Sequence, residues 1–88
     1  MKLEIISPQG AVLQKEITQV SLPGTVGIFT VLNNHAPIIS TLRKGKVSYQ
    51  TNEKVDEEVE IEKGVVEVKK NKVMVFVEQV KKNGHAQV

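Results

Sequence analysis

Two stretches near the C-terminus alternate strictly between apolar and charged residues. Val59 and Ile61 alternate with glutamates at 58, 60 and 62, and Val66 and Val68 alternate with Glu67. Alternation with a period of two is typical of a β-strand with one buried face and one solvated face. Both stretches are therefore predicted to be antiparallel strands. The glutamates between the apolar residues are interpreted as a solvated face and not as paired catalytic carboxylates.

The rest of the chain repeats this pattern in short runs. Val and Ile together supply 22 of the 88 residues, and β-branched side chains favour strands over helices. Clusters of Gly, Pro, Asn and Lys separate the runs at intervals of about ten residues, as expected of a sandwich or barrel. We expect one all-β domain over residues 1–80, a flattened two-sheet β-sandwich of eight to ten short, mostly antiparallel strands. The predicted strands are 2–6, 11–15, 16–22, 27–32, 38–42, 46–51, 57–62, 64–69 and 72–79.

The last predicted strand is apolar on both faces. Val73, Val75 and Val77 form one face, and Met74 and Phe76 make the other face apolar too. A sandwich buries each sheet on one face only, so the second face needs cover from a loop of the same chain or from a partner. Both explanations remain open at this point.

Residues 17–42 contain no Asp, Glu, Lys or Arg, although a quarter of the whole sequence is charged. A surface segment normally carries charges, so this segment is expected to supply core strands, an interface, or both. It is not a membrane span, because Pro23, Gly24, Gly27 and Pro37 interrupt the apolar helix of about 20 residues that a bilayer requires. No direct membrane insertion and no signal peptide are expected.

Composition offers little material for catalysis or for metal binding. The chain has no cysteine, and His35 and His85 are its only histidines. No carboxylate is close in sequence to His35 to orient it as a base, no phosphate-binding glycine motif is present, and no metal-ligand spacing occurs. We therefore expect no catalytic residue, no metal and no cofactor.

Nucleic acid is not expected to be the principal ligand. The net charge is only +2, basic and acidic residues are interleaved, and the chain has only three aromatic residues for stacking on bases. A free, nucleic-acid-binding β-barrel of the OB type remains the alternative function, since it shares the size and the high content of strands. A small β-sandwich enzyme is a third hypothesis, weakened by the lack of converging titratable groups.

The segment LPGTVGIFTVLNNHAPIISTLRKG, residues 22–45, resembles the N-terminal β-sandwich domain of the epsilon subunit of F-type ATP synthases. The opening MKLEIISPQG is similar to the first strand and turn of that family, and KGVVEVKKNKVMVFVE is similar to its closing hairpin. In order and spacing, the resemblance covers about residues 2–79. It implies a non-catalytic rotor subunit of the ATP synthase complex, peripheral on the cytoplasmic face of the bacterial inner membrane. Such a subunit binds gamma and the c-subunit ring and couples proton-driven rotation to ATP synthesis.

The resemblance also implies contact residues. Those expected to touch the c-ring are Gly27, Ile28 and Phe29. Those expected to touch gamma are Ser7, His35, Ala36, Pro37 and Ser40.

The chain departs from the family pattern at two turns and at its end. Ile28 stands where relatives commonly have glutamate, and Asn33-Asn34 stands where they commonly have Pro-Gly. Asn tolerates positive φ, so this turn is still expected to form. Residues 81–88 are expected to be a short tail in place of the helical hairpin that in relatives can inhibit ATP hydrolysis. We expect no such inhibition here.

Overall fold

The computed structural model describes residues 1–78 and 80–81, and these residues form strands and no helix. Within this part of the chain, no segment is a helix long and apolar enough to cross a bilayer. The predicted tail falls outside the described residues, apart from Lys81. The strands are β1 Lys2–Ser7, β2 Gly10–Pro23, β3 Ile28–Leu32, β4 Ile38–Leu42, β5 Gly45–Thr51, β6 Asp56–Ile61, β7 Gly64–Lys69, β8 Lys72–Val77 and β9 Val80–Lys81.

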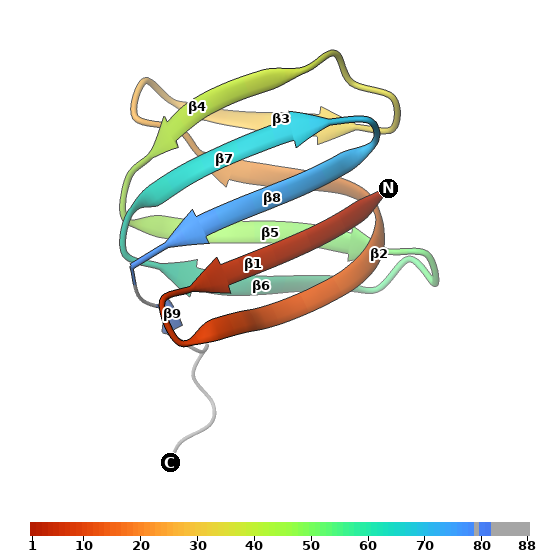
Figure 1. Cartoon of the computed structure of the whole chain (residues 1–88). Coiled ribbons are helices and arrows are strands. Elements are labelled where there is room, and N and C mark those ends of the chain that lie inside the picture. The colour runs from red at the N-terminus through yellow and green to blue at the C-terminus, as the bar shows by residue number, and fades with distance from the viewer. Residues whose placement is uncertain (79, 82–88) are drawn as a thin grey trace.

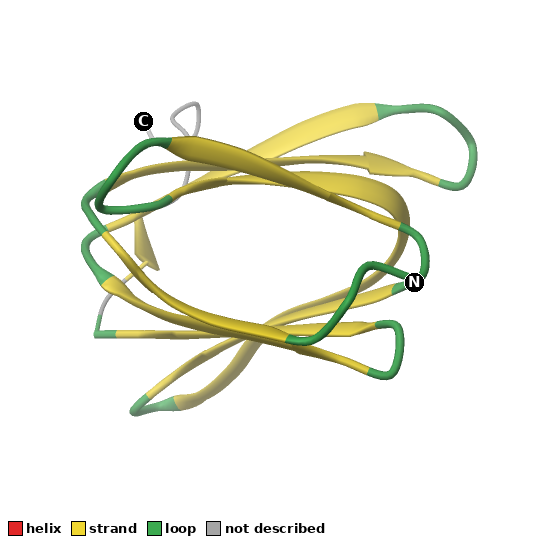
Figure 2. Ribbon diagram, turned by 90° about the horizontal axis from the view of Figure 1, so that it is seen from above, coloured by secondary structure: helices red, strands yellow, loops and turns green. Residues whose placement is uncertain are grey.

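The strands form one curled sheet that folds over on itself into two layers (Figure 1, Figure 2). Along the sheet the order is β4, β7, β8, β1, β2, β5, β6 and β9, and β3 pairs with β2 beside this path. The pairing is antiparallel throughout the described strands, except that β1 runs parallel to β8. The expectation of an all-β sandwich of mostly antiparallel strands is confirmed.

Strand β2 joins the two layers and corrects one predicted boundary. The predicted strands 11–15 and 16–22 are a single strand of 14 residues. Its first half pairs with β1 and its second half with β3 and β5, and the register shifts between Ile17 and Gln19. No Gly or Pro interrupts this stretch, so the chain changes layers through an irregularity of the β-bulge type without a turn.

The last predicted strand, 72–79, is also shorter than expected. Strand β8 ends at Val77, and Gln79 lies outside the described residues. The two-residue strand β9 follows and pairs with the end of β6, where Ile61 lies opposite Val80.

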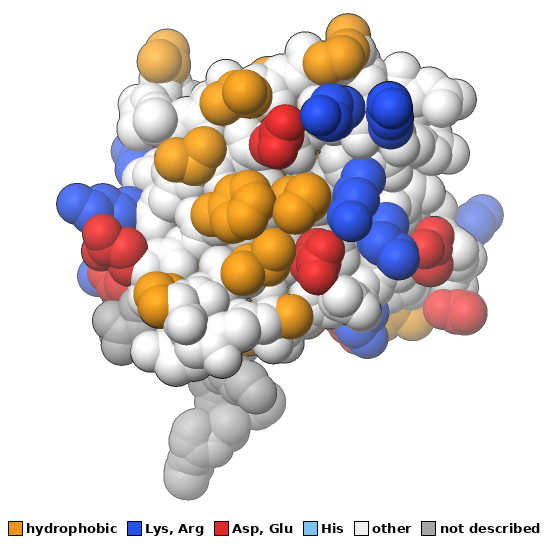
Figure 3. Space-filling view, viewed as in Figure 1, with side chains coloured by type: hydrophobic (Ala, Val, Ile, Leu, Met, Phe, Trp, Pro, Cys, Tyr) orange, Lys and Arg blue, Asp and Glu red, His pale blue; other side chains and the backbone are white. Residues whose placement is uncertain are grey.

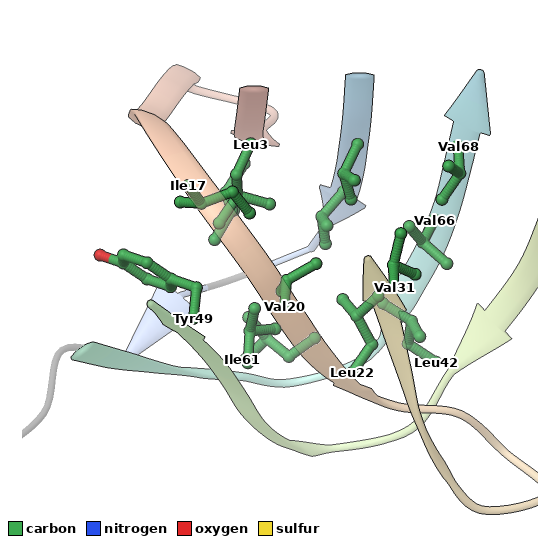
Figure 4. Packing of buried hydrophobic residues seen from close by; sticks show 14 of the residues in the cluster. Leu3, Ile17, Val20, Leu22, Val31, Leu42, Tyr49, Ile61, Val66 and Val68 are labelled. Atoms are coloured by element: carbon green, nitrogen blue, oxygen red, sulfur yellow. The ribbon is translucent and has the colours of Figure 1, made fainter. Parts of the chain in front are cut away.

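The core lies between the two layers and is built by the predicted alternation. Val66, Val68, Val73 and Val75 from one layer are essentially inaccessible, as is Ile61 from the other. Figure 4 shows Val66, Val68 and Ile61 meeting side chains of β2 and β3, and Val73 and Val75 belong to the same cluster.

Candidate docking surfaces

The outer side of the layer formed by β4, β7, β8 and β1 carries a group of apolar side chains that no part of the described chain covers (Figure 3). Ile39 is 73% exposed, Val65 39% and Phe76 40%. Ile6 and Met74 beside them are half-buried. We call these five residues the apolar face.

Strand register makes the apolar face continuous. Phe76 lies opposite Ile6 of β1 on one side and opposite Val65 of β7 on the other. Met74 belongs to the next row, in which Ile39 lies opposite Glu67. Side chains that are directly opposite in neighbouring strands have Cβ atoms within about 5.5 Å. The two rows together place apolar side chains on four strands, with Glu67 between Met74 and Ile39.

Charged residues border the apolar face on two sides: Lys63 and Glu78 lie beside Val65 and Phe76 on one side, and a row of lysines lies on the other. Lys2, Lys72 and Lys69 form a row across three strands. The Lys72 Nζ lies 3.6 Å from a Glu4 carboxylate oxygen, and the Lys69 Nζ lies 3.9 Å from Glu67. A hydrogen bond from the Gln14 amide, with help from Lys72, lowers the pKa of Glu4. The lysines of both pairs are exposed, so these pairs contribute little to the stability of the fold.

A second apolar feature is the tip of the loop between β2 and β3. Val26 is fully exposed and Ile28 is 72% exposed. Phe29, which was predicted to contact the c-ring with Ile28, instead packs half-buried against the core. A Cβ atom added to Gly24 would lie 3.0 Å from the Phe29 ring, so the ring fills the space beside that glycine. The side chains that the tip presents are Val26 and Ile28, and we call residues 26–28 the tip.

The loop from 33 to 37 projects at the other end of β3, and His35, Ala36 and Pro37 are exposed in it. Asn34 adopts the left-handed conformation at a φ of 63°, as the Asn-Asn turn predicts. The Asn34 N–H donates to the Asn71 side-chain oxygen at 2.8 Å, which fixes this loop to the β7–β8 turn. His35 Nδ1 lies 2.7 Å from the Ala36 carbonyl oxygen.

The two serines predicted to contact gamma occupy different places. The Ser7 hydroxyl is directed into the β1–β2 turn, where it donates to Gln9 Oε1 at 3.1 Å and accepts the Gln9 N–H at 3.3 Å. Ser40 is half-buried in β4. Neither side chain is as available to a partner as its neighbours on the apolar face, Ile6 and Ile39.

The predicted contact residues therefore lie at the two ends of the layer formed by β4, β7, β8 and β1, and the apolar face lies between these ends. The tip lies beside the end of β4, where the Thr25 and Thr41 hydroxyls are 3.0 Å apart. Residues 33–37 lie beside the start of β4. Ser7 ends β1 on the side of the tip, because β1 and β8 run parallel and β8 ends next to Gly64. Sequence reasoning identified Met74 and Phe76 but missed Val26, Ile39, Val65 and Ile6.

The titratable groups of the described residues do not converge on a reaction centre. Among them, no three of His, Asp and Glu come together as metal ligands would. The Tyr49 hydroxyl is buried and donates to Glu57 at 2.8 Å, and both conditions raise its pKa. Tyr49 thus stays protonated and closes one side of the core.

A family model for the ATP synthase delta/epsilon chain β-sandwich domain matches residues 1–83. The ATP synthase epsilon chain of Chlorobium limicola is 37% identical over 79 residues, which cover 90% of both chains. The epsilon chain of Sulfurimonas denitrificans is 42% identical over 78 residues, which cover 89% of this chain but 60% of that one. The match favours the rotor hypothesis over a free OB-type barrel.

Two solved structures share the fold at low sequence identity. A chain in the mitochondrial ATP synthase of Euglena gracilis, solved with OSCP, F1 and the c-ring, superposes with a TM-score of 0.84 at 16% identity. That match covers 91% of this chain and 51% of the other. A chain in the central stalk and c-ring of the Tetrahymena thermophila enzyme gives a TM-score of 0.79 at 14% identity over 93% of this chain and 66% of that one.

Proposed function

The chain belongs to the family of ATP synthase delta and epsilon chain β-sandwich domains, and from this premise we propose a specific role for each of its two apolar surfaces. The chain is a non-catalytic subunit of the rotor. The apolar face and the loop 33–37 bind the gamma subunit, and the tip rests on the c-subunit ring. The subunit thereby transmits rotation of the ring to the catalytic head. The observation that supports this role most directly is the uncovered apolar face.

Binding to gamma is supported by what the apolar face lacks. The interior of a protein interface is depleted of charged residues, because burying an unpaired charge is costly. Ile6, Phe76 and Val65 form a row across three strands without a charge between them, whereas Glu67 lies next to Ile39 and the lysine row lies beyond it. An aromatic residue surrounded by aliphatic side chains is also the usual composition of an energetic hot spot. Ser7 and Ser40 would then lie at the edges of the contact.

Contact with the c-ring is supported by the tip. Val26 and Ile28 offer two exposed apolar side chains on a loop without charges. A loop of this kind can bury apolar surface on a partner without the cost of desolvating a charge. Burial of the apolar Ile28 side chain then favours binding at a position where relatives commonly have a glutamate.

Both contacts put the domain, residues 1–80, at the membrane surface as a peripheral part of the complex. In a bacterial enzyme this is the cytoplasmic face of the inner membrane. The proposed partners are gamma, the c-ring and, through them, the whole ATP synthase. No cofactor takes part in this role.

The experiment is to isolate the ATP synthase from source membranes that carry a tagged copy of this chain. We expect gamma and c subunits to be recovered with the tag. The substitution Ile28→Asp should reduce recovery of c subunits and proton-driven ATP synthesis while the isolated domain stays folded. Val55→Asp is the matched control, because Val55 is 49% exposed in the β5–β6 loop outside both surfaces. Unchanged ATP synthesis in the Ile28→Asp enzyme would refute the role of the tip, and recovery of neither subunit with the wild-type chain would refute the proposal as a whole.

A further inference from the structure

Strand β3 has an open edge without the protection that edge strands usually carry. It pairs with β2 on one side, and among the described residues no ladder joins its other side to β4. Edge strands normally avoid pairing with other chains by means of lysine, proline or a bulge. The five residues of β3 are Ile, Phe, Thr, Val and Leu, and its ladder with β2 is regular. The edge is therefore a ready template for another strand.

The ladder with β2 identifies the backbone groups on the open edge. Ile28 lies opposite Pro23, which has no N–H and whose carbonyl accepts the Arg43 N–H at 2.9 Å. This pair is therefore not a hydrogen-bonded pair, and the alternation of an antiparallel ladder assigns the β2-bonded positions to Phe29 and Val31. The N–H and C=O groups of Ile28 and Thr30 consequently point away from β2. Those of Leu32 do too, and its carbonyl accepts the His35 N–H at 3.1 Å.

Strand β4 borders the same opening, which is closed at one end. The Thr41 carbonyl accepts the Thr25 N–H at 3.2 Å, and Gly24 forms a bridge with Leu42. Toward its start, β4 has no such partner among the described residues, and Ile39 is highly exposed there. Beyond the closed end, no ladder joins β3 to β4 among the described residues.

Side chains on the open strand suit an uncharged companion. Ile28 and Leu32 are 72% and 54% exposed on the outer face, with Thr30 between them. The Thr30 and Ser21 hydroxyls are 2.8 Å apart, so this side chain already has a partner in its own sheet. An added strand would place its alternate side chains beside Ile28 and Leu32, where β-branched or aromatic residues pack best.

We propose that the open edge of β3 binds an extended, uncharged segment of the gamma subunit, which adds to the sheet as a further strand. This inference rests on the proposed function, because the open edge leads directly into the loop 33–37, which that function assigns to gamma. A strand on β3 would thus extend the proposed gamma surface from one layer of the sandwich to the other. A second copy of this chain pairing through its own β3 is the competing occupant.

Proline at position 30 tests the backbone contact. Thr30→Pro removes an N–H that points away from β2, and proline is tolerated in an edge strand when its ring faces outward. Thr30→Ala is the matched control, since it removes the same hydroxyl but keeps the N–H. Binding to purified gamma should weaken at least tenfold in Thr30→Pro and less than threefold in Thr30→Ala, with both variants folded by circular dichroism. Hydrogen exchange at single-residue resolution supplies the second measurement. On addition of gamma, the amides of Ile28 and Thr30 should exchange at least tenfold more slowly.

The results of these measurements distinguish strand addition by gamma, dimerisation through β3 and failure of the proposed function. Equal gamma affinity for Thr30→Pro and Thr30→Ala, with unchanged exchange at Ile28 and Thr30, would overturn strand addition and leave the apolar face as the gamma contact. Dimerisation of the chain alone in analytical ultracentrifugation, abolished by Thr30→Pro, would assign the edge to a second copy and overturn gamma as its occupant. If wild-type chain fails to bind gamma at all, the proposed function is refuted and the strand-addition proposal with it.

Discussion

Two adjacent residues of β8 should separate the stability of the domain from its binding. Val75 points into the core and is inaccessible, whereas Phe76 points outward and is 40% exposed. We expect Val75→Ala to act on folding and Phe76→Ala to act on gamma binding. The two positions share one strand and one local backbone, so each variant controls for the other.

The expected magnitudes follow from burial. Val75→Ala removes two buried methyl groups, at about 0.8 kcal/mol each for transfer, and leaves a cavity, so the loss of unfolding free energy should be about 2 to 3 kcal/mol. Phe76 is little more than half buried, so its truncation should cost about 1 to 1.5 kcal/mol. For a domain of this size, about 1 kcal/mol corresponds to a shift of about 4 to 8 °C in Tm. The core variant should therefore melt the earlier of the two.

Binding should show the reverse order. If Phe76 is an anchor of the gamma contact, its loss should cost about 2 kcal/mol of binding, or about 30-fold in Kd. Urea unfolding followed by circular dichroism gives the stabilities. Calorimetric titration with gamma at a temperature where both variants are folded gives the affinities. A weaker gamma affinity for Val75→Ala than for Phe76→Ala would refute the assignment of the outer face to gamma.

Three further predictions concern the scaffold. A Cβ at Gly64 would overlap a backbone carbonyl of β8, so Gly64→Ala should lower the unfolding free energy by about 1 to 3 kcal/mol, and an unchanged urea midpoint would contradict the close approach of the two strands. Asn34→Ala should cost about 1 kcal/mol and Asn34→Gly much less, because alanine is strained at a φ of 63°; equal urea midpoints would argue against the left-handed turn. Burial and the Glu57 hydrogen bond raise the pKa of Tyr49 above its usual 10.0, so the stability that depends on its protonated form is complete below about pH 10 and is lost as the pH rises further. Compared with Tyr49→Phe, the wild type should lose more stability as the pH rises above about 10; parallel pH profiles of the urea midpoint would contradict that shift.

Local sequence signals were sufficient to predict most of the fold. Val59 and Ile61 against glutamates, and Val66 and Val68 against Glu67, fixed the face of each strand because the side-chain period of a strand is two. The Asn33-Asn34 turn also formed as its chemistry predicts. What local signals could not supply was the path of β2. Its change of layer depends on a register shift near Ile17, and the interior of β2 has no Gly or Pro that would indicate such a shift.

The candidate site was predicted less completely. Gly27, Ile28 and Phe29 were expected to contact the c-ring. Strand alternation turns Phe29 inward, and Val26 is fully exposed on the same loop. A usable signal for the apolar face was present in Ile5-Ile6, Ile38-Ile39 and Val65-Val66. In a strand, two adjacent apolar residues place one side chain inside and one outside. Each of these pairs thus predicts one apolar side chain on the outer surface.

The parallel pairing of β1 with β8 has a consequence for how the chain is made. Lys2 lies beside Lys72, 70 residues further along, and β1 is held between that strand and β2. During synthesis, the first strand leaves the ribosome long before its second neighbour exists. Until β8 is complete, β1 can form a hairpin with β2 but keeps one edge open, and contacts of this sequence separation slow folding. The domain should therefore reach its native state only after β8 has left the ribosome, and a nascent chain stopped before residue 72 should stay sensitive to proteases.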